Sequence, residues 1–330
     1  MRATKNAMKL AAVFVLAMIL SMSGCQTAGE DDGVITIGVV QLVTHRALDA
    51  AYDGFVAALA DNGYRDGYEI RLDFHNALGE IANLSTICDR FVSNRVDMIL
   101  AITTPAAQVA ASKTETIPIV GTAITSFENA RLVDSNEAPG GNVTGSSDMN
   151  PIAAQIGLIR ELMPDAQTLG FIYNSSEANS VLQIGIAREQ ATLLGFDYVE
   201  VTVTNTNDVY QAMQSLVSRC DVIYIPTDNT LASAMATVQS VTIESGTPTF
   251  CADTNMTLEG GFASMGINYF DLGYDAGLMA IEIINGADPA TMPIRFATSS
   301  DVIVINGFML DVLGFELPEK YLGYVFYPEE

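Results

Sequence analysis

The order of elements along this chain is repeated, and this repetition constrains the fold more than any other feature of the sequence. Short apolar runs typical of buried strands alternate with amphipathic helical stretches, which is the pattern of a parallel α/β sheet. The Gly-rich stretch at 139–145 is interpreted as a joint, after which the same order begins again. The expected strands are at 34–40, 70–74, 97–102 and 117–121 in the first series, and at 168–173, 198–203, 221–226 and 247–251 in the second.

The two halves also share local sequence. The stretch "VSNRVDMILAITTPAAQVAAS" matches "VSRCDVIYIPTDNTLASAMA", and "TIPIVGTA" matches "GTPTFCAD". Duplicate units of this size predict an α/β protein of two doubly wound parallel-sheet lobes joined by a hinge. A helix at 269–286 and a strand at 301–307 follow the second series, and we expect the chain to cross between the lobes there. The predicted boundaries are 34–147 plus about 269–293 for the first lobe, and 148–268 plus about 294–330 for the second.

The first 24 residues have the order of a secretory signal peptide. Basic residues precede the apolar run "LAAVFVLAMIL", and the small residues of "SMSGC" follow it. The segment before Cys25 resembles a bacterial lipobox, so we expect a lipid on Cys25, then a linker at 25–33. The alternative is an ordinary signal peptide with an incidental cysteine. Lipidation would place the protein on the outer face of the bacterial cell membrane, or make it a periplasmic lipoprotein.

The charge of the chain argues against a nucleic-acid partner. The formal net charge is −24, and the signal segment carries three of the positive charges and no negative ones. A surface this acidic repels nucleic acid. Cys88, Cys220 and Cys251 form no closely spaced pair, so neither a zinc site nor a redox motif is supported. We expect no metal and no cofactor, and we interpret these cysteines as buried thiols whose pairing stays open.

Enzymatic motifs are missing from the sequence. The chain has two histidines, His45 and His75, and no Gly-x-Ser-x-Gly elbow accompanies them. No dinucleotide fingerprint, P-loop or His-Glu-x-x-His motif is present. The sequence therefore predicts a binding protein and not an enzyme.

Polar loops follow the expected strands and are the candidate ligand site. Ligands of parallel sheets bind outside the carboxyl ends of the strands. In the second half these loops carry Glu177, Asp228 and Asp253, and lysine is absent from all six strand-end loops of the two halves. Such acids suit an ammonium group, while hydroxyls and helix N-termini suit a carboxylate, so the pattern favours an α-amino acid. The alternative is that these residues are ordinary helix N-caps, although Glu is not a preferred cap.

At "YNSSEANS", "PTDNTLAS" and "PGGNVTG" the chain resembles the ABC transporter substrate-binding proteins of the tryptophan/tyrosine type. The resemblance runs from about Val34 to Phe326 and implies a type I periplasmic-binding fold whose ligands are mainly aromatic amino acids. It implies that Thr104 and Thr125 reach the ligand's carboxylate, and that Tyr269 and Phe270 line the side-chain pocket or pack in the core. The residues implied to bind the ligand's backbone groups are Asn174, Ser175, Glu177, Asn179, Ser180, Asp228, Asn229, Thr230 and Asp253.

One loop departs from the family pattern. The family often has Glu-His-Pro before "ALDAA", whereas this chain has Thr44, His45 and Arg46, which removes an acid and adds a cation. Side-chain specificity is therefore open. We expect a monomer that captures an amino acid between its lobes and delivers it to a membrane permease with its ATPase. The alternatives are a binding protein for a sugar, a nucleoside or a signal molecule that acts as a receptor without transport, or an enzyme on the same fold.

Overall fold

The computed structural model describes residues 33–297 and 302–327. The predicted signal segment at 1–24, the lipid-attachment residue Cys25 and the linker up to residue 32 lie outside the described residues. Within the described ranges, no helix is both long and apolar enough to cross a membrane.

The first sheet is parallel throughout and has the strand order β2-β1-β3-β4-β5-β11. The helices packed on it are α2, α3, α4 and α11, and together these elements form the first lobe. The strands are β1 (Ile35–Gln41), β2 (Ile70–Asn76), β3 (Met98–Ile102), β4 (Ile119–Ile124), β5 (Val143–Ser147) and β11 (Arg295–Phe296), and the helices are α2 (Arg46–Asp61), α3 (Ile81–Asn94), α4 (Thr104–Lys113) and α11 (Tyr269–Ile284), with the 3₁₀ turn η2 (Pro289–Thr291).

The second sheet has the order β7-β6-β8-β9-β10-β12-β13, in which only the β10–β12 pair is antiparallel among the described strands. It forms the second lobe with the helices around it. The strands are β6 (Thr168–Asn174), β7 (Asp197–Val203), β8 (Val222–Ile225), β9 (Thr249–Cys251), β10 (Ala263–Gly266), β12 (Val302–Asn306) and β13 (Val325–Phe326); the helices are α5 (Ile152–Leu162), α6 (Ala178–Leu193), α7 (Val209–Val217), α8 (Asn229–Ala232), α9 (Met235–Ser245), α10 (Thr254–Leu258) and α12 (Gly307–Leu313), with 3₁₀ turns η1 (Thr206–Asp208) and η3 (Glu319–Tyr324).

The two sheets repeat one topology. The order β2-β1-β3-β4-β5 in the first has its counterpart in β7-β6-β8-β9-β10 in the second. The predicted fold class, two α/β lobes with parallel sheets, is confirmed. In each sheet the strand order reverses at the first strand of the repeat, and the crevice beside such a switch point is where this architecture binds ligands.

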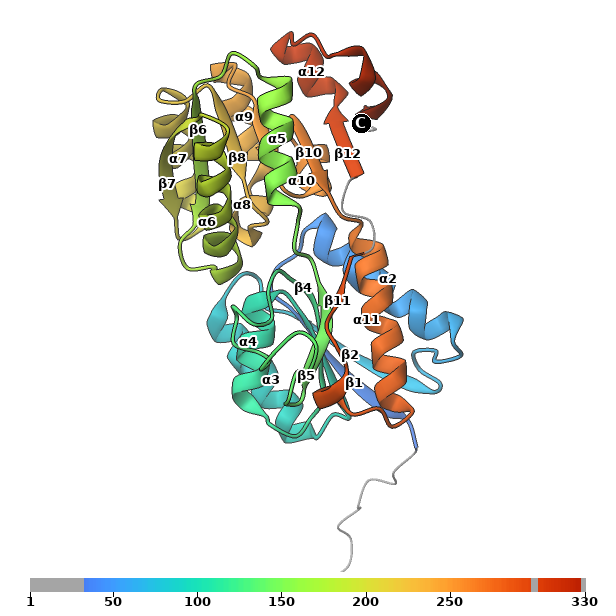
Figure 1. Cartoon of the computed structure of the whole chain (residues 1–330). Coiled ribbons are helices and arrows are strands. Elements are labelled where there is room, and N and C mark those ends of the chain that lie inside the picture. The colour runs from blue at the N-terminus through green and yellow to red at the C-terminus, as the bar shows by residue number, and fades with distance from the viewer. Residues whose placement is uncertain (1–32, 298–301, 328–330) are drawn as a thin grey trace, which may run out of the picture. The chain divides into compact units, whose positions relative to one another are not determined.

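Alternate residues of each strand pack on opposite faces of its sheet, which is why both faces need helices. In the first lobe, α2 and α11 cover one face of the sheet and α3 and α4 the other (Figure 1). Ile37 and Val39 pack toward α2 and α11, whereas Val40 packs toward α3 and α4. A Cβ added to Gly273 would lie 1.8 Å from the carbonyl oxygen of Ala51, so the close crossing of α11 over α2 requires this glycine.

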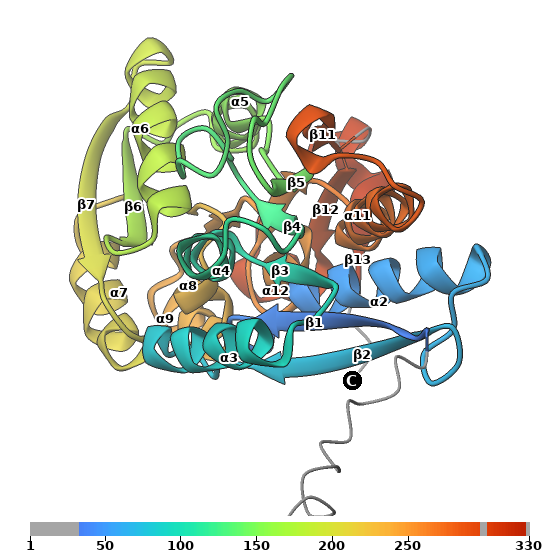
Figure 2. The same ribbon diagram turned by 90° about the horizontal axis from the view of Figure 1, so that it is seen from below.

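The second lobe is layered in the same way. Phe171 and Tyr173 of β6 pack in the core formed with α5 and α6, whereas Ile172 packs in the core formed with α7 and α9. β7 is the edge strand, beside β6 (Figure 2). Both cores are apolar and continuous, so the strand-end loops rest on rigid supports.

The segment at 139–145, predicted to be a joint, contains the start of β5. Val143 and Thr144 are β-branched, and they pair with Ile119 and Val120. A Cβ on Gly145 would lie 2.0 Å from a carbonyl oxygen of β4, so this glycine permits a close approach between strands and does not mark a flexible linker. The prediction of a joint there was wrong because glycine was interpreted as a loop signal.

The exact residues at which one lobe ends and the other begins stay a prediction. The first sheet takes up β11, Arg295–Phe296, just beyond the predicted return to the second lobe at about 293. Among the described residues, chain crossings between the sheets follow β5 and β10. The first of these crossings carries a residue of the site described next.

Candidate ligand-binding site

Three neighbouring strands of the second sheet end at the loops that carry the predicted acids. Glu177 precedes α6 after β6, Asp228 precedes α8 after β8, and Asp253 precedes α10 after β9. Because β6, β8 and β9 are adjacent and parallel, the three loops emerge at one edge of the sheet.

Asp228 and Asp253 line one small cavity, which we call the acidic cavity. Its volume is about 20 Å³, enough for roughly one water molecule. Both lobes contribute to it, since His45 and Ala123 of the first lobe lie opposite the loops of the second. Its apolar lining consists of Leu48, Ala123, Ala232 and Met256.

A third acid, Asp148, lines the same cavity and was not predicted. All three aspartates are nearly inaccessible to solvent. No lysine or arginine lines the cavity in the described part of the chain. Burial also lowers the pKa of His45, which disfavours a positive charge on its ring. Three buried carboxyl groups therefore share a space that lacks a protein cation, which is costly unless protons or a bound cation compensate.

Asp228 serves as an N-cap in addition to lining the cavity. Its Oδ1 accepts a hydrogen bond from the amide of Leu231 at 2.9 Å, and its Oδ2 accepts one from the amide of Asn174 at 2.6 Å. Burial, together with the nearby charge of Glu177, raises the pKa of Asp228 to about 7. The predicted alternative, that this residue is a cap, is correct, and the cap also faces the cavity.

Asp253 is also an N-cap, but the hydrogen bonds to its carboxylate reach one of the two oxygens. Its Oδ1 accepts from the amide and the side chain of Asn255, at 2.7 and 3.2 Å. Burial raises the pKa of Asp253 to about 7, with a further contribution from the charges of Asp148 and Glu259. The carboxylate is therefore held by one oxygen at the wall of a cavity that disfavours its charge.

Asp148 is bound by groups of the first lobe. The hydroxyl of Tyr269 donates to its Oδ2 at 2.9 Å, and the backbone amide of Asp148 donates to the carbonyl of Ile124 at 3.1 Å. Burial raises the pKa of Asp148 despite the bond from Tyr269. Its Oδ1 is buried and has no hydrogen-bond partner among the described residues.

Asn179 and Ser180 sit in the first turn of α6 and face the loop after β8. Asn179 Nδ2 donates to the carbonyl of Thr227 at 2.8 Å, and the Ser180 hydroxyl donates to the same carbonyl at 3.2 Å. Because the amide nitrogen of Asn179 is committed to this acceptor, its Oδ1 is left as an acceptor, and it is buried without a partner in the described structure. Asn179 lines the acidic cavity, so this oxygen is a second unused acceptor there.

Glu177 lies elsewhere. It does not appear in the lining of the acidic cavity, and its carboxylate accepts hydrogen bonds from the start of α8. The amide and side chain of Asn229 donate to Oε2 at 3.1 and 2.6 Å, and the amide and hydroxyl of Thr230 donate to Oε1 at 3.2 and 3.0 Å. The buried Glu177 therefore organises α8 through internal bonds.

The remaining predicted residues of this loop differ in exposure. Asn174 is buried, and its Nδ2 donates to the hydroxyl of Thr230 at 2.8 Å, which ties β6 to α8. Ser175 is exposed to solvent, and its backbone amide bonds to the carbonyl of Val203. Asn174, Asn229 and Thr230 thus belong to the network around Glu177, whereas the Ser175 side chain lies at the surface.

The Glu177 network borders a second and larger space, which we call the larger groove. Its volume is about 680 Å³, within the range of about 300–1,000 Å³ typical of ligand pockets. Leu42, Ile81 and Val109 of the first lobe supply apolar surface, and Glu177 and Thr230 lie on the opposite side. Asn229 lines both the groove and the acidic cavity, so the two spaces adjoin at this residue.

Thr104 and Thr125 of the first lobe, which were predicted to contact the ligand's carboxylate, are both buried. Thr125 accepts a hydrogen bond from Gln183 of α6 at 3.2 Å, a contact that joins the lobes. The hydroxyl of Thr104, at the start of α4, has no partner among the described residues. It appears in the lining of neither space, and its contact with a ligand stays a prediction.

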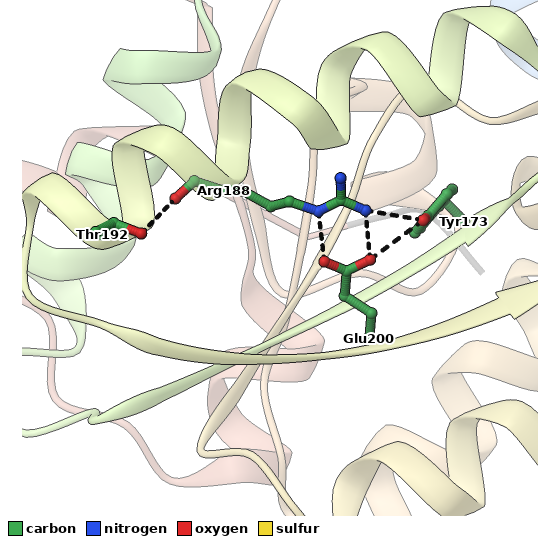
Figure 3. Close-up of polar contacts among 4 residues, drawn as sticks. All are labelled: Tyr173, Arg188, Thr192 and Glu200. Carbon is green, nitrogen blue, oxygen red and sulfur yellow. Dashed lines mark hydrogen bonds and ion pairs between the residues drawn. The ribbon is translucent and has the colours of Figure 1, made fainter.

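The start of α6 is held in place by an ion pair farther along the helix. Arg188 forms a two-point contact with Glu200 of β7, and its Nη2 also donates to the hydroxyl of Tyr173 at 3.1 Å (Figure 3). Planar two-point pairing fixes geometry better than a single contact. It ties α6, whose first turn carries Asn179 and Ser180, to the β6–β7 edge.

One residue that lines the acidic cavity, Asp148, and one that bonds to its wall, Gln183, were missed for identifiable reasons. Asp148 directly follows β5, the strand mistaken for a joint, so its position at a strand end went unnoticed. Gln183 is four residues after Asn179 on α6 and is fully buried, so a polar residue on the buried face of that helix was the available signal. Of the two aromatic candidates, Tyr269 lines the acidic cavity and Phe270 is exposed.

Metal ligation and disulfide pairing do not occur among the described residues. No group of three His, Cys, Asp or Glu side chains is arranged to hold a metal ion in residues 33–297 and 302–327. Cys88, Cys220 and Cys251 are free thiols there.

Two duplicated α/β lobes with polar strand-end loops around a shared cavity define a class: the two-lobed binding proteins that hold a ligand between their lobes. The family model described as ABC transporter substrate binding protein matches residues 36–326. The chain therefore belongs to the family of ABC transporter substrate-binding proteins, with the type I periplasmic-binding fold, and it is not an enzyme.

A curated relative and a solved structure are similar over most of the chain. The tyrosine-binding protein of Clostridioides difficile (strain R20291) is 40% identical over 268 residues, covering 81% of this chain and 78% of that protein. The crystal structure of the ABC domain in complex with L-Trp from Streptococcus pneumonia has a TM-score of 0.86 and 37% identity, covering 89% of this chain and 100% of that one.

A second solved structure is the ligand-free, open form of a substrate-binding protein with adhesive properties from Clostridium difficile. It is 40% identical, covers 90% of this chain and 100% of its own, and has a TM-score of 0.69. The score is lower than with the L-Trp complex although the identity is higher. The described residues from Ile35 onward are thus arranged more like the ligand-bound relative than like the open one.

Proposed function

We propose that the protein is an extracytoplasmic, lipid-anchored monomer that captures an aromatic α-amino acid between its lobes and delivers it to an ABC permease. The observation that carries the proposal is the acidic cavity, where buried Asp148, Asp228 and Asp253 face a space without a protein cation. An ammonium group supplies the missing positive charge, and buried carboxylates accept its hydrogen bonds.

The aromatic side chain is supported by the relatives and by the larger groove. One relative is named a tyrosine-binding protein, and one similar structure contains L-Trp. The acidic cavity, at about 20 Å³, cannot hold a whole amino acid without movement of the lobes or of the lining side chains. The larger groove beyond Asn229 has apolar walls at Leu42, Ile81 and Val109. Movement that joins the two spaces provides room for a ring.

The ligand proposal is tested by a binding panel on the mature protein. The chain contains no tryptophan, so the fluorescence of L-Trp reports its binding without a protein tryptophan background. Titration calorimetry with L-Tyr, L-Trp and L-Phe is expected to show binding, and L-Leu is expected to bind at least about tenfold more weakly, a loss of about 1.4 kcal/mol. Binding of sugars or nucleosides with no binding of amino acids would overturn the proposal.

Membrane anchoring rests on Cys25 and needs a separate test. The lipobox-like segment before Cys25 supports diacylation. Expression of the full chain with a labelled fatty acid is expected to label the protein, whereas Cys25→Ser is expected to abolish the label and release the protein from the membrane fraction. An unlabelled wild-type protein would leave an ordinary signal peptide as the correct interpretation.

A further inference from the structure

Asp148 occupies a crossing between the lobes. It directly follows β5 of the first sheet and precedes α5 of the second lobe. Tyr269 begins α11, shortly after the crossing that leaves β10. The hydrogen bond from Tyr269 to Asp148 Oδ2, 2.9 Å long, therefore ties one crossing to the other.

The other oxygen of Asp148 is unused. Asp148 is 4% exposed, and its Oδ1 has no hydrogen-bond partner among the described residues. A buried carboxylate oxygen without a donor is unfavourable, because the water that would solvate it has been removed. The residue lines the acidic cavity, so the natural donor is a group that enters that cavity.

A second unused acceptor lines the same cavity from the second lobe. Asn179 is 7% exposed, and its Oδ1 also lacks a partner in the described structure. An ammonium group has three N–H donors, which matches Asp148 Oδ1, Asn179 Oδ1 and the carboxyl group of Asp253. These acceptors come from a crossing and from two loops of the second lobe.

We propose that Asp148 binds the ammonium group of the ligand, and that its place on a crossing makes the ligand's positive charge a condition for closure of the lobes. The inference rests on the proposed amino-acid function and adds a contact from the hinge itself. A ligand that lacks the ammonium group leaves Asp148 Oδ1 without a donor in the closed form, so such a ligand stabilises closure less.

A purely structural role is the competing explanation. Asp148 holds the crossings together through Tyr269, and loss of that bond alone could change closure. Tyr269→Phe removes this hydroxyl and leaves the Asp148 carboxyl group in place. It therefore separates the bond between crossings from contact with the ligand.

The test compares Asp148→Asn, Tyr269→Phe and the wild type, with exposed Asp165→Asn as a charge control. Affinity for L-Tyr and for its deaminated analogue 3-(4-hydroxyphenyl)propionate is measured by calorimetry, and closure by the ligand-induced change in radius of gyration in X-ray scattering. The wild type is expected to prefer L-Tyr by about 100-fold or more, since a buried charged contact is worth several kcal/mol. In Asp148→Asn the preference is expected to fall below about tenfold, with weaker closure at saturating L-Tyr.

Asp165→Asn is expected to leave both affinities unchanged, whereas Tyr269→Phe, at a residue that lines the cavity, is expected to weaken both ligands by a similar factor and so keep their ratio. Should Asp148→Asn not fold, Asp148→Ser carries the same comparison, and Asp148→Glu is expected to restore part of the preference. An unchanged preference in folded Asp148→Asn or Asp148→Ser overturns the inference, as does a loss of equal size in Tyr269→Phe. If the wild type binds no amino acid at all, the proposed function fails instead, so the two failures are distinct.

Discussion

The strand-end loops of the two lobes occupy equivalent positions but differ in charge. The first lobe places His45 at the acidic cavity and has the buried hydroxyls of Thr104 and Thr125 at its strand ends, whereas the second lobe places Asp228 and Asp253 at the cavity. The two sheets share one topology, whereas the residues of their strand-end loops differ. If the ligand is an amino acid, as proposed, its ammonium group is expected to contact the second lobe and its carboxylate the first, so that closure of the lobes would favour ligands that carry both groups.

A second contrast exists within the second lobe. Glu177 receives hydrogen bonds from both backbone amides at the start of α8, whereas the bonds to Asp253 reach one oxygen. Acids at equivalent strand ends thus divide into one that shapes the loops and one that faces the cavity.

The largest expected effect is the loss of L-Tyr affinity when Asp253 is replaced. Asp253→Asn keeps the shape of the side chain and the acceptor for Asn255, but removes a charge from the acidic cavity. Affinity for L-Tyr is expected to fall by about 100- to 1,000-fold, because loss of one partner of a buried charge pair costs about 3–5 kcal/mol. Calorimetry measures the loss, and exposed Asp53→Asn is the control. A loss below about threefold would mean that Asp253 is only a helix cap.

Glu177→Gln is expected to act mainly on stability. One carboxylate oxygen becomes an NH₂ group facing the donors of Asn229 or Thr230. The free energy of unfolding is expected to fall by about 2–3 kcal/mol, because buried donors lose their acceptor. Chemical denaturation measures it, with exposed Glu189→Gln on the same helix as the control. A larger loss of L-Tyr affinity than in Asp253→Asn would reverse the assigned roles.

The next largest expected effect is a change in the free energy of unfolding with pH. Asp228 and Asp253 have folded-state pKa values raised to about 7 from the ordinary 3.8. Between about pH 4 and 7 the folded state therefore binds more protons than the unfolded state, and the stability of the unliganded protein falls as pH rises through this window. Each group contributes up to about 1.4 kcal/mol per pH unit. Burial also raises the pKa values of Asp148 and Glu259, which adds to this effect, whereas the lowered pKa of His45 opposes it.

Thermal melts from pH 8 to pH 5 measure this slope, and Asp253→Asn is the matched variant because it removes one of the two groups. The difference between the wild-type and variant slopes isolates Asp253 from all other titrating groups. Saturating L-Tyr is expected to flatten the wild-type slope, since the ammonium group favours ionised carboxylates. Identical slopes for wild type and Asp253→Asn would contradict the raised pKa.

The sequence predicted the repeated fold well because hydrophobic periodicity is a local property. The strands at 70–74 and 168–173 appear as Ile70–Asn76 and Thr168–Asn174. β5 was missed because Gly145 serves a contact with a strand 24 residues earlier, as the pairing of Gly145 with Gly121 shows, and no local pattern reports such a contact.

The site was only partly predictable for the same reason. Strand ends placed Asp228 and Asp253 in the right loops, since neighbouring parallel strands end at one edge. Residue type alone could not show that Glu177 is occupied by the amides of α8 or that Asp148 joins the cavity from a crossing. These facts depend on which groups meet after the lobes assemble.

Replacement of Thr104 tests whether a neutral hydroxyl group of the first lobe contacts the ligand. Its hydroxyl is buried and lacks a partner among the described residues, so Thr104→Val is expected to leave the free energy of unfolding unchanged or slightly raised. If the hydroxyl binds the ligand's carboxylate, affinity falls by about tenfold, or about 1.4 kcal/mol. The matched variant is Thr103→Val, which loses the cap on the amide of Ala106 and is expected to cost about 1 kcal/mol of stability. Unchanged affinity in Thr104→Val would remove Thr104 from the site.

The smallest expected effect is the change in L-Tyr affinity when Arg46, the cation at the rim of the first lobe, is replaced. Arg46 Nε lies 3.4 Å from Glu259 Oε1 of the second lobe, and the Arg46 side chain is 63% exposed. An exposed pair of this kind is worth about 0–1 kcal/mol and is screened by salt. Arg46→Gln is therefore expected to change L-Tyr affinity by less than about threefold, and by less still at high salt, as titration at two ionic strengths would show. A loss above about tenfold that persists in high salt would mean that Arg46 binds the ligand's carboxylate, and the first lobe would then contribute charge as the second does.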